Sequence, residues 1–170
     1  MHRFRWLCMI IGCLFSGKSK DPLAPVSSIF WITPFDVEFA SAYSHTFFSF
    51  QALGRWKYTI KNFPMRRFFR EKWSPYTYAE IIRFQRTMKL FSKVQSITRV
   101  YYWDEKMVYF EHKLLVNSEL VARGFSRGAY HNSKGRINPY DFINLGPYKG
   151  DIPDVVVDWC KTDNAIKEEI

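Results

Sequence analysis

Bulky apolar residues follow two kinds of spacing along the chain, and each spacing predicts a kind of element. Residues 44–60 contain no Pro and carry apolar side chains too densely for strict alternation, which predicts a helix largely covered by other structure. Four later segments of roughly ten residues are rich in Val, Ile, Tyr, Phe and Thr, which predicts strands. They are residues 76–88, 94–103, 107–116 and 120–130. The polar breaks at 104–106 and 117–119 are of hairpin length, so we expect the strands to run antiparallel.

The first part of the chain adds a strand and an apolar N-terminal segment. Residues 29–32 are apolar and aromatic and are followed by Pro34, which predicts a short buried strand. Residues 1–16 place two Arg before an apolar run of about ten residues, which is too short to span a bilayer, since that needs about 20. This segment is either a signal or transit peptide, or a helix that packs on its own domain or rests on a membrane surface. We favour the helix, followed by a linker with two Pro at residues 21–25.

One strand, a long helix and four antiparallel strands predict an α+β domain. A sheet of that size must bury one face, and the long apolar helix is the only predicted element able to cover it. We therefore expect a curved antiparallel sheet of about five strands wrapped around a long central helix, plus a short N-terminal helix. The expected boundaries are the N-terminal helix and linker at residues 1–24, the domain at 25–160 and an acidic C-terminal tail at 161–170.

The composition is that of a folded, basic protein. The 170 residues are 47% hydrophobic and 19% aromatic, which excludes a disordered chain. The net charge of +9 is concentrated between residues 55 and 93, where eleven Lys and Arg accompany two Glu. Such a basic band favours an anionic partner, such as phosphate groups, nucleic acid, a lipid surface or an acidic protein. The three Cys have neither CxxC spacing nor clustered His, so no disulfide framework and no metal site is predicted.

Six short motifs, in this order along the chain, resemble those of a known family. They are Thr33-Pro34-Phe35-Asp36-Val37-Glu38, Leu53-Gly54-Arg55-Trp56, Arg83-Phe84-Gln85-Arg86-Thr87-Met88-Lys89-Leu90-Phe91, Trp103-Asp104-Glu105-Lys106, Tyr109-Phe110-Glu111-His112 and Val121-Ala122-Arg123. Over about residues 25–160 the chain thus resembles the hotdog-fold thioesterase superfamily, in the thioesterase-like branch related to 4-hydroxybenzoyl-CoA thioesterase. The resemblance implies a hotdog fold and hydrolysis of acyl-CoA thioesters. His112 matches a position of that family, but a lone strand His is more often structural.

The segment before the central helix departs from the pattern of that family. Where the family has Asp-x-Asp and then His-Met-Asn-Asn, this chain has Asp36-Val37-Glu38 and then residues 39–45, ending in His45. The resemblance implies a catalytic site of Asp36, Glu38 and His45, because Glu38 and His45 keep the seven-residue separation of a related branch. Glu38 would supply the carboxylate, and His45 would orient it or act as an acid. The alternative is that the two carboxylates cap the following helix and that His45 is a polar residue of its first turns.

The basic band has three candidate partners. The resemblance implies that Arg83, Arg86 and Lys89 bind the phosphates of coenzyme A. A mixture of basic and aromatic residues favours docking to a protein or a membrane surface; it consists of Arg66, Arg67, Phe68, Phe69, Arg70 and Trp73. Nucleic-acid binders show a similar mixture, but no RNA-binding signature accompanies it here. We rank docking first, coenzyme A second and nucleic acid third.

Two functions fit these observations. The first is a thioesterase-like subunit that has lost efficient catalysis and serves in a larger, membrane-associated assembly, with a mitochondrial location suggested by the basic and apolar N-terminus. The second is an active acyl-CoA thioesterase that works as a homo-oligomer, in the cytoplasm or at a membrane. The absence of the His-Met-Asn-Asn stretch and the aromatic, basic surface favour the first. No cofactor is predicted for either function, and a coenzyme A thioester would be the substrate of the second.

Overall fold

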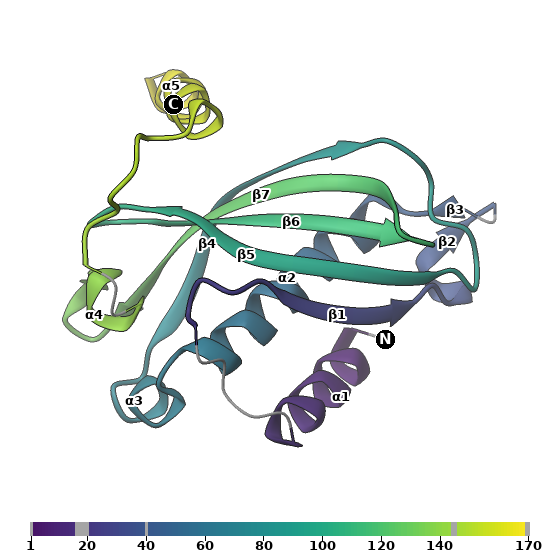
Figure 1. The fold of residues 1–170 in the computed structure, drawn as a ribbon, viewed down its shortest axis with the longest axis horizontal. Helices are drawn as coiled ribbons and strands as arrows, with labels where there is room; N and C mark the ends of the chain where they lie inside the picture. The colour runs from purple at the N-terminus through teal and green to yellow at the C-terminus, as the bar shows by residue number, and fades with distance from the viewer. Residues whose placement is uncertain (1, 16–20, 40, 144–145, 169–170) are drawn as a thin grey trace.

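A curved antiparallel sheet lies against a long helix in the computed structural model, which describes residues 2–15, 21–39, 41–143 and 146–168 (Figure 1). In chain order the elements are α1 (His2–Phe15), β1 (Val26–Trp31), the 3-10 turn η1 (Pro34–Asp36), β2 (Val37–Glu38), β3 (Ser41–Ala42), α2 (Ser44–Asn62), α3 (Met65–Arg70), β4 (Ser74–Phe84), β5 (Lys93–Trp103), β6 (Val108–Val116), β7 (Glu119–Asn132), β8 (Gly135–Ile137), α4 (Tyr140–Ile143) and α5 (Asp154–Glu168). This arrangement confirms the α+β architecture and the central helix expected of a hotdog fold.

The main sheet has the strand order β1-β5-β6-β7-β4, and each neighbouring pair is antiparallel. The predicted antiparallel arrangement of the strands is therefore confirmed: β5, β6 and β7 are neighbours in chain order, and β4 pairs with β7. Between β6 and β7 the connection is a two-residue turn in which Asn117 and Ser118 both have positive φ, at 51° and 66°, as the twist of a tight hairpin requires. Strand β7 continues two residues beyond the predicted end at residue 130, to Asn132, and then pairs with β8.

The sheet curves because its ladders contain irregularities. Register shifts occur between Thr77 and Ala79 of β4, between Val100 and Tyr102 of β5, and where Leu114 and Leu115 of β6 pair with β7. An extra residue in one strand of an antiparallel pair bends that strand and increases its local twist. The resulting concave face receives α2 (Figure 1).

The central helix α2 buries the side that faces the sheet. Its buried residues recur at three- and four-residue spacing, as expected for one face of a helix; they are Thr46, Phe47, Phe50, Gln51, Leu53, Gly54, Tyr58 and Thr59. Gly54 lies against β5, where a Cβ atom would come 2.2 Å from Thr98 Oγ1. The helix therefore approaches the sheet at a point where only Gly fits without displacement.

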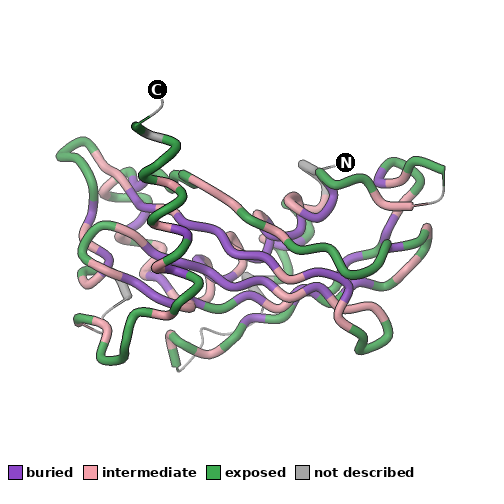
Figure 2. The backbone as a smooth tube through the Cα atoms, turned by 90° about the horizontal axis from the view of Figure 1, so that it is seen from above, coloured by how far each residue is buried: buried purple, intermediate pink, exposed green. Residues whose placement is uncertain are grey.

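Two further helices pack on opposite sides of this core. Met9 of α1 belongs to the same buried cluster as Phe50 of α2, which places α1 beside α2 (Figure 1). On the other side of the sheet, Trp159 of α5 packs in a cluster with Tyr109. Figure 2 shows α5 largely exposed while the strands beneath it are buried. The expected boundary at residue 160 falls inside α5, and residues 169–170 of the expected tail lie outside the described residues.

Candidate functional site

The connection between β1 and α2 positions Asp36 by local hydrogen bonds. Pro34 occupies the first turn of η1, where its missing N–H removes no hydrogen bond. Asp36 Oδ2 accepts from Thr33 N at 2.8 Å and from Thr33 Oγ1 at 2.5 Å. The Asp36 carbonyl accepts from Tyr43 N at 2.9 Å and from Thr46 Oγ1 at 3.1 Å. The turn is thereby tied to the start of α2.

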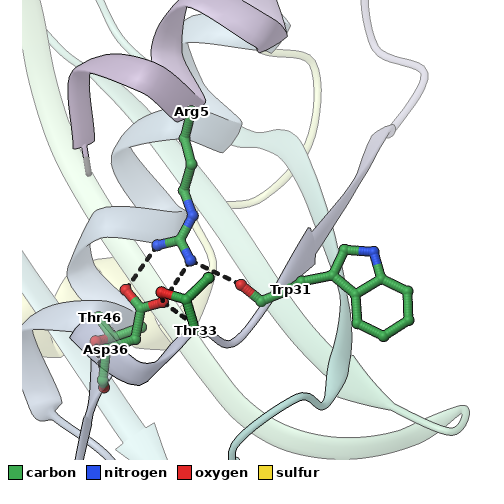
Figure 3. Close-up of polar contacts among 5 residues, drawn as sticks. All are labelled: Arg5, Trp31, Thr33, Asp36 and Thr46. Carbon is green, nitrogen blue, oxygen red and sulfur yellow. Dashed lines mark hydrogen bonds and ion pairs between the residues drawn. The ribbon is translucent and has the colours of Figure 1, made fainter.

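The Asp36 carboxylate also binds Arg5 of α1 (Figure 3). Arg5 Nη1 donates to Asp36 Oδ1 at 2.7 Å, and Arg5 Nη2 donates to Asp36 Oδ2 and, at 2.7 Å, to the Trp31 carbonyl. The guanidinium lies 5.3 Å from the centre of the Phe50 ring, so a single arginine contacts α2, β1 and η1. This contact fixes the N-terminal helix to the segment that precedes α2.

These contacts determine the protonation state of Asp36. Burial alone would raise the pKa of Asp36, but the hydrogen bonds from Arg5 and Thr33 outweigh it and hold the pKa at about 2. Both carboxylate oxygens are engaged, and the residue is 5% exposed. In this geometry Asp36 is a weak base, and its evident contribution is to hold α1 and η1 together.

Glu38 and His45 lie on either side of the start of α2 and are both exposed. Glu38 pairs with Ser41 in the small β2–β3 hairpin, and His45 stacks on Tyr43 with ring centroids 5.0 Å apart. Within residues 21–39 and 41–143, no hydrogen bond or ion pair joins Glu38 to His45. The seven-residue separation therefore does not assemble a catalytic pair in this structure.

The alternative, in which the carboxylates of Asp36 and Glu38 cap α2, is not observed either. The N-cap residue of α2 is Tyr43, and no side chain caps the helix there. Among the described residues, no group of His, Cys, Asp and Glu is placed to hold a metal ion.

The three residues expected to bind coenzyme A lie at the end of β4 and in the connection that follows. Arg83, Arg86 and Lys89 are all exposed, and Arg86 forms an ion pair with Glu119. Arg83 lies opposite Arg123 of β7 in the sheet register. The structure thus leaves a basic surface here.

The predicted docking surface was wrong for two of its six residues. Phe68, in α3, and Trp73, just after it, are each 5% exposed and belong to a core cluster. Arg67 is half-buried and donates to Glu71 at 2.8 Å. Three members of the set remain at the surface; they are Arg66, Phe69 and Arg70.

A row of buried polar side chains lies beneath α2 and was not predicted from the sequence. Thr98 Oγ1 lies 3.0 Å from His112 Nδ1, and His112 Nε2 lies 2.9 Å from Ser126 Oγ. Burial, with a smaller contribution from Arg55, lowers the pKa of His112 well below its usual value. The prediction that His112 is structural agrees with this placement. The sequence signal that could have indicated this row is a polar residue at an inward-facing position in each of three adjacent strands.

The comparisons with known proteins concern the family and the fold of this chain. The sequence model of the Thioesterase-like superfamily matches residues 36–160, a range that covers α2 and every strand of the main sheet except β1. No curated protein is matched.

Solved structures of the same fold come from several bacteria. A probable thioesterase from Bartonella henselae is 16% identical with a TM-score of 0.60, over 68% of this chain and 98% of that one. DHNA-CoA thioesterase from Staphylococcus aureus is 11% identical with a TM-score of 0.62, over 86% and 95%. A thioesterase from Thermus thermophilus, in complex with coenzyme A and Zn, is 16% identical with a TM-score of 0.62, over 70% and 94%. With the family match over most of its length, this chain belongs to the Thioesterase-like superfamily and has its hotdog fold.

Proposed function

We propose that this chain is a thioesterase-like subunit that has lost efficient hydrolysis and acts by binding within a larger assembly. The observation that carries the proposal is the state of the three candidate catalytic residues. Asp36 is buried with both carboxylate oxygens engaged, while Glu38 and His45 are exposed and do not contact each other.

The chemistry of thioester hydrolysis explains why this state disfavours catalysis. A carboxylate must activate water or attack the carbonyl, and N–H donors must face the developing oxyanion. Asp36 with a pKa of about 2 has little affinity for the proton of an attacking water. Glu38 sits in a two-residue strand at the surface, and a misplacement of about 1 Å can cost about a hundredfold in rate.

The second candidate is an active acyl-CoA thioesterase. It is favoured by the exposure of Glu38 and His45. The His45 ring stacks on Tyr43, and among the described residues neither side chain has another hydrogen bond, ion pair or ring contact. Several proteins of this fold are named as coenzyme A thioesterases. In this reading Arg83, Arg86 and Lys89 would bind the phosphates of the substrate.

The surface supports a role in binding. Arg66, Phe69 and Arg70 project from α3, and Phe69 is 73% exposed. On α1, Trp6, Leu7 and Ile11 are 40%, 51% and 46% exposed. Among the described helices, none is long and apolar enough to cross a membrane. In the proposed assembly α3 therefore contacts a protein partner and α1 rests on a membrane surface.

Hydrolysis of acyl-CoA thioesters across chain lengths separates the two candidates. We expect the purified protein to release free coenzyme A no faster than its Glu38→Ala and His45→Ala variants, because no base is assembled beside the substrate. Arg66→Ala serves as a matched control outside the segment that contains Asp36, Glu38 and His45. Turnover at least a hundredfold above that of Glu38→Ala would overturn the proposal and establish the enzyme.

A further inference from the structure

A groove separate from the candidate catalytic residues lies between α1, β1 and α2. Its volume is about 490 Å³, within the range of about 300–1,000 Å³ that is usual for small-molecule sites. Neither Asp36, Glu38 nor His45 lines it. The groove follows the outer edge of β1, the edge that does not pair with β5.

The walls of the groove are mainly apolar. Met9 and Gly12 lie one helical turn apart on the face of α1 that turns toward it, and the Phe30 side chain lines it from the same face of β1 as Ser28. The side chains of Ile29 and Trp31, each 57% exposed, alternate with those of Ser28 and Phe30 and project from the other face of β1, so the groove meets only the part of these residues near the main chain. A Cβ atom on Gly12 would meet nothing within 4 Å, which leaves room for a ligand at this point. Contiguous apolar surface of this kind is typical of a binding groove.

The floor of the groove contains a polar group in need of a partner. Ser28 is 4% exposed and lines the groove, and its hydroxyl has no hydrogen-bond partner among the described residues. A buried hydroxyl without a partner is costly, so such groups normally bind something.

One end of the groove is positively charged. Lys57 and Lys61 both line it, and their four-residue separation places them on the same face of α2. Lys57 Nζ donates to the carbonyl of Ser27 at 2.7 Å, which holds this ammonium group next to Ser28. At the other end, the charge of Arg5 is matched by Asp36. Two ammonium groups therefore line the end of the groove opposite the Arg5–Asp36 pair.

We propose that this groove binds a medium-chain fatty acid, with its carboxylate at Lys57 and Lys61 and its chain along β1. The Ser28 hydroxyl would donate to the carboxylate, and the chain would lie between Gly12 of α1 and Phe30 of β1. From Ser27 to Trp31 the strand covers about 13 Å at about 3.3 Å per residue. An extended chain of about twelve carbon atoms covers that distance, because each bond of about 1.5 Å advances a zigzag chain by less than its full length. The inference is independent of whether the protein hydrolyses thioesters.

Calorimetric titration of the full chain with dodecanoate below its micellar concentration tests the proposal. We expect saturable binding and an increase in the unfolding temperature with ligand concentration. Affinity should rise about twofold to fourfold per added methylene from hexanoate to dodecanoate, because each methylene buries apolar surface. Dodecanol, which lacks the carboxylate, should bind at least tenfold more weakly. Equal binding of dodecanoate and dodecanol would overturn the role of the lysines.

Two variants test the location of the ligand, each with a matched control. Gly12→Leu fills the groove and should weaken dodecanoate binding at least tenfold, whereas Ile11→Ala, on an exposed side of α1, should leave it unchanged. Lys61→Glu should weaken binding about tenfold, whereas Lys106→Glu makes the same charge change in a distant exposed turn and should have little effect. Unfolding temperatures near that of the wild type confirm that the variants are folded.

Three outcomes would overturn the proposal. They are no binding of dodecanoate by the wild type, equal weakening by Lys61→Glu and Lys106→Glu, and unchanged binding by Gly12→Leu. Binding to anionic phospholipid vesicles that is lost in Ile11→Ala, without binding of dodecanoate, would show instead that this face contacts a membrane surface.

Discussion

Arg5 and Asp36 form the ion pair that joins the N-terminal helix to the start of α2. Their side chains are 13% and 8% exposed, so the pair lies largely out of water. Breaking such a pair leaves an unpaired buried charge, which typically costs about 3–5 kcal/mol. The contact therefore makes the position of α1 depend on a single arginine near the N-terminus.

Asp36 should make the stability of the fold depend on pH in the acidic range. The folded state lowers the pKa of Asp36 from 3.8 to about 2, so the ionised carboxylate contributes about 2 kcal/mol above pH 4. That contribution is lost as the pH falls from about 4 to about 2. We expect Asp36→Asn to reduce the free energy of unfolding at pH 7, and the difference from the wild type to shrink below pH 4.

Urea denaturation between pH 7 and pH 2 measures this difference. Asp151→Asn, at an exposed position, is the matched control and should change the free energy of unfolding little at any pH. A difference between wild type and Asp36→Asn that stays constant from pH 5 to pH 2 would contradict the assignment.

The contacts of these residues show which part of the site the sequence could predict. Asp36 lies in the connection before α2, as its place in the sequence predicts, but its partner Arg5 lies 31 positions earlier, and no local pattern indicates such a contact. His112 was interpreted as structural because it stands alone on a strand, and its two hydroxyl partners come from neighbouring strands. The spacing of Glu38 and His45 fits a catalytic pair, but the intervening hairpin sets their separation in space.

At the scale of the elements, the long periodic segments were predicted well, and the short helix α3 was not. The strands and α2 agree with their predicted ranges within a few residues, because each buries one face and so carries a regular pattern. Helix α3 has only six residues, too few to show a helical period, so its Phe68 was expected at the surface. The aromatic residues of such a segment are placed by tertiary packing.

Two glycines in helices should respond in opposite ways to replacement by alanine. At Gly54 the added methyl group would lie 2.2 Å from Thr98 Oγ1, so Gly54→Ala should destabilise the fold by about 1–3 kcal/mol, although Ala favours helices. At Gly12 nothing lies within 4 Å, so Gly12→Ala should stabilise the fold by up to about 1 kcal/mol. Denaturant unfolding of both variants measures the difference. Equal stabilisation of both would show that α2 can move away from the sheet at no cost.

At the scale of the whole molecule, the two edges of the sheet differ. Along the outer edge of β1, side chains bind two carbonyl groups, since Lys57 donates to that of Ser27 and Arg5 to that of Trp31. The outer edge of β4 pairs with no strand among the described residues, and its apolar side chains are exposed; they are Tyr76, Tyr78, Ile81 and Phe84 at 59%, 46%, 41% and 46%. An open apolar edge is a site at which sheets associate.

We expect two copies of the chain to associate through β4. Sedimentation of the purified protein should show a dimer, and Ile81→Lys should shift it toward the monomer by at least tenfold in the dissociation constant, because a charge is then buried at the contact. Ile152→Lys, at an exposed apolar position outside the sheet, is the matched control. A dimer unaffected by Ile81→Lys would mean that another surface forms the contact.

The bound carbonyls of β1 limit how far such an association can extend. A sheet with two open edges can add copies at both ends and grow into a fibre, whereas a sheet with one open edge is complete after a single pairing. Lys57 and Arg5 thus occupy carbonyl groups that another copy would need in order to add a strand at β1. Loss of either side chain would reopen a second edge and convert a finite pair into a species able to grow without limit.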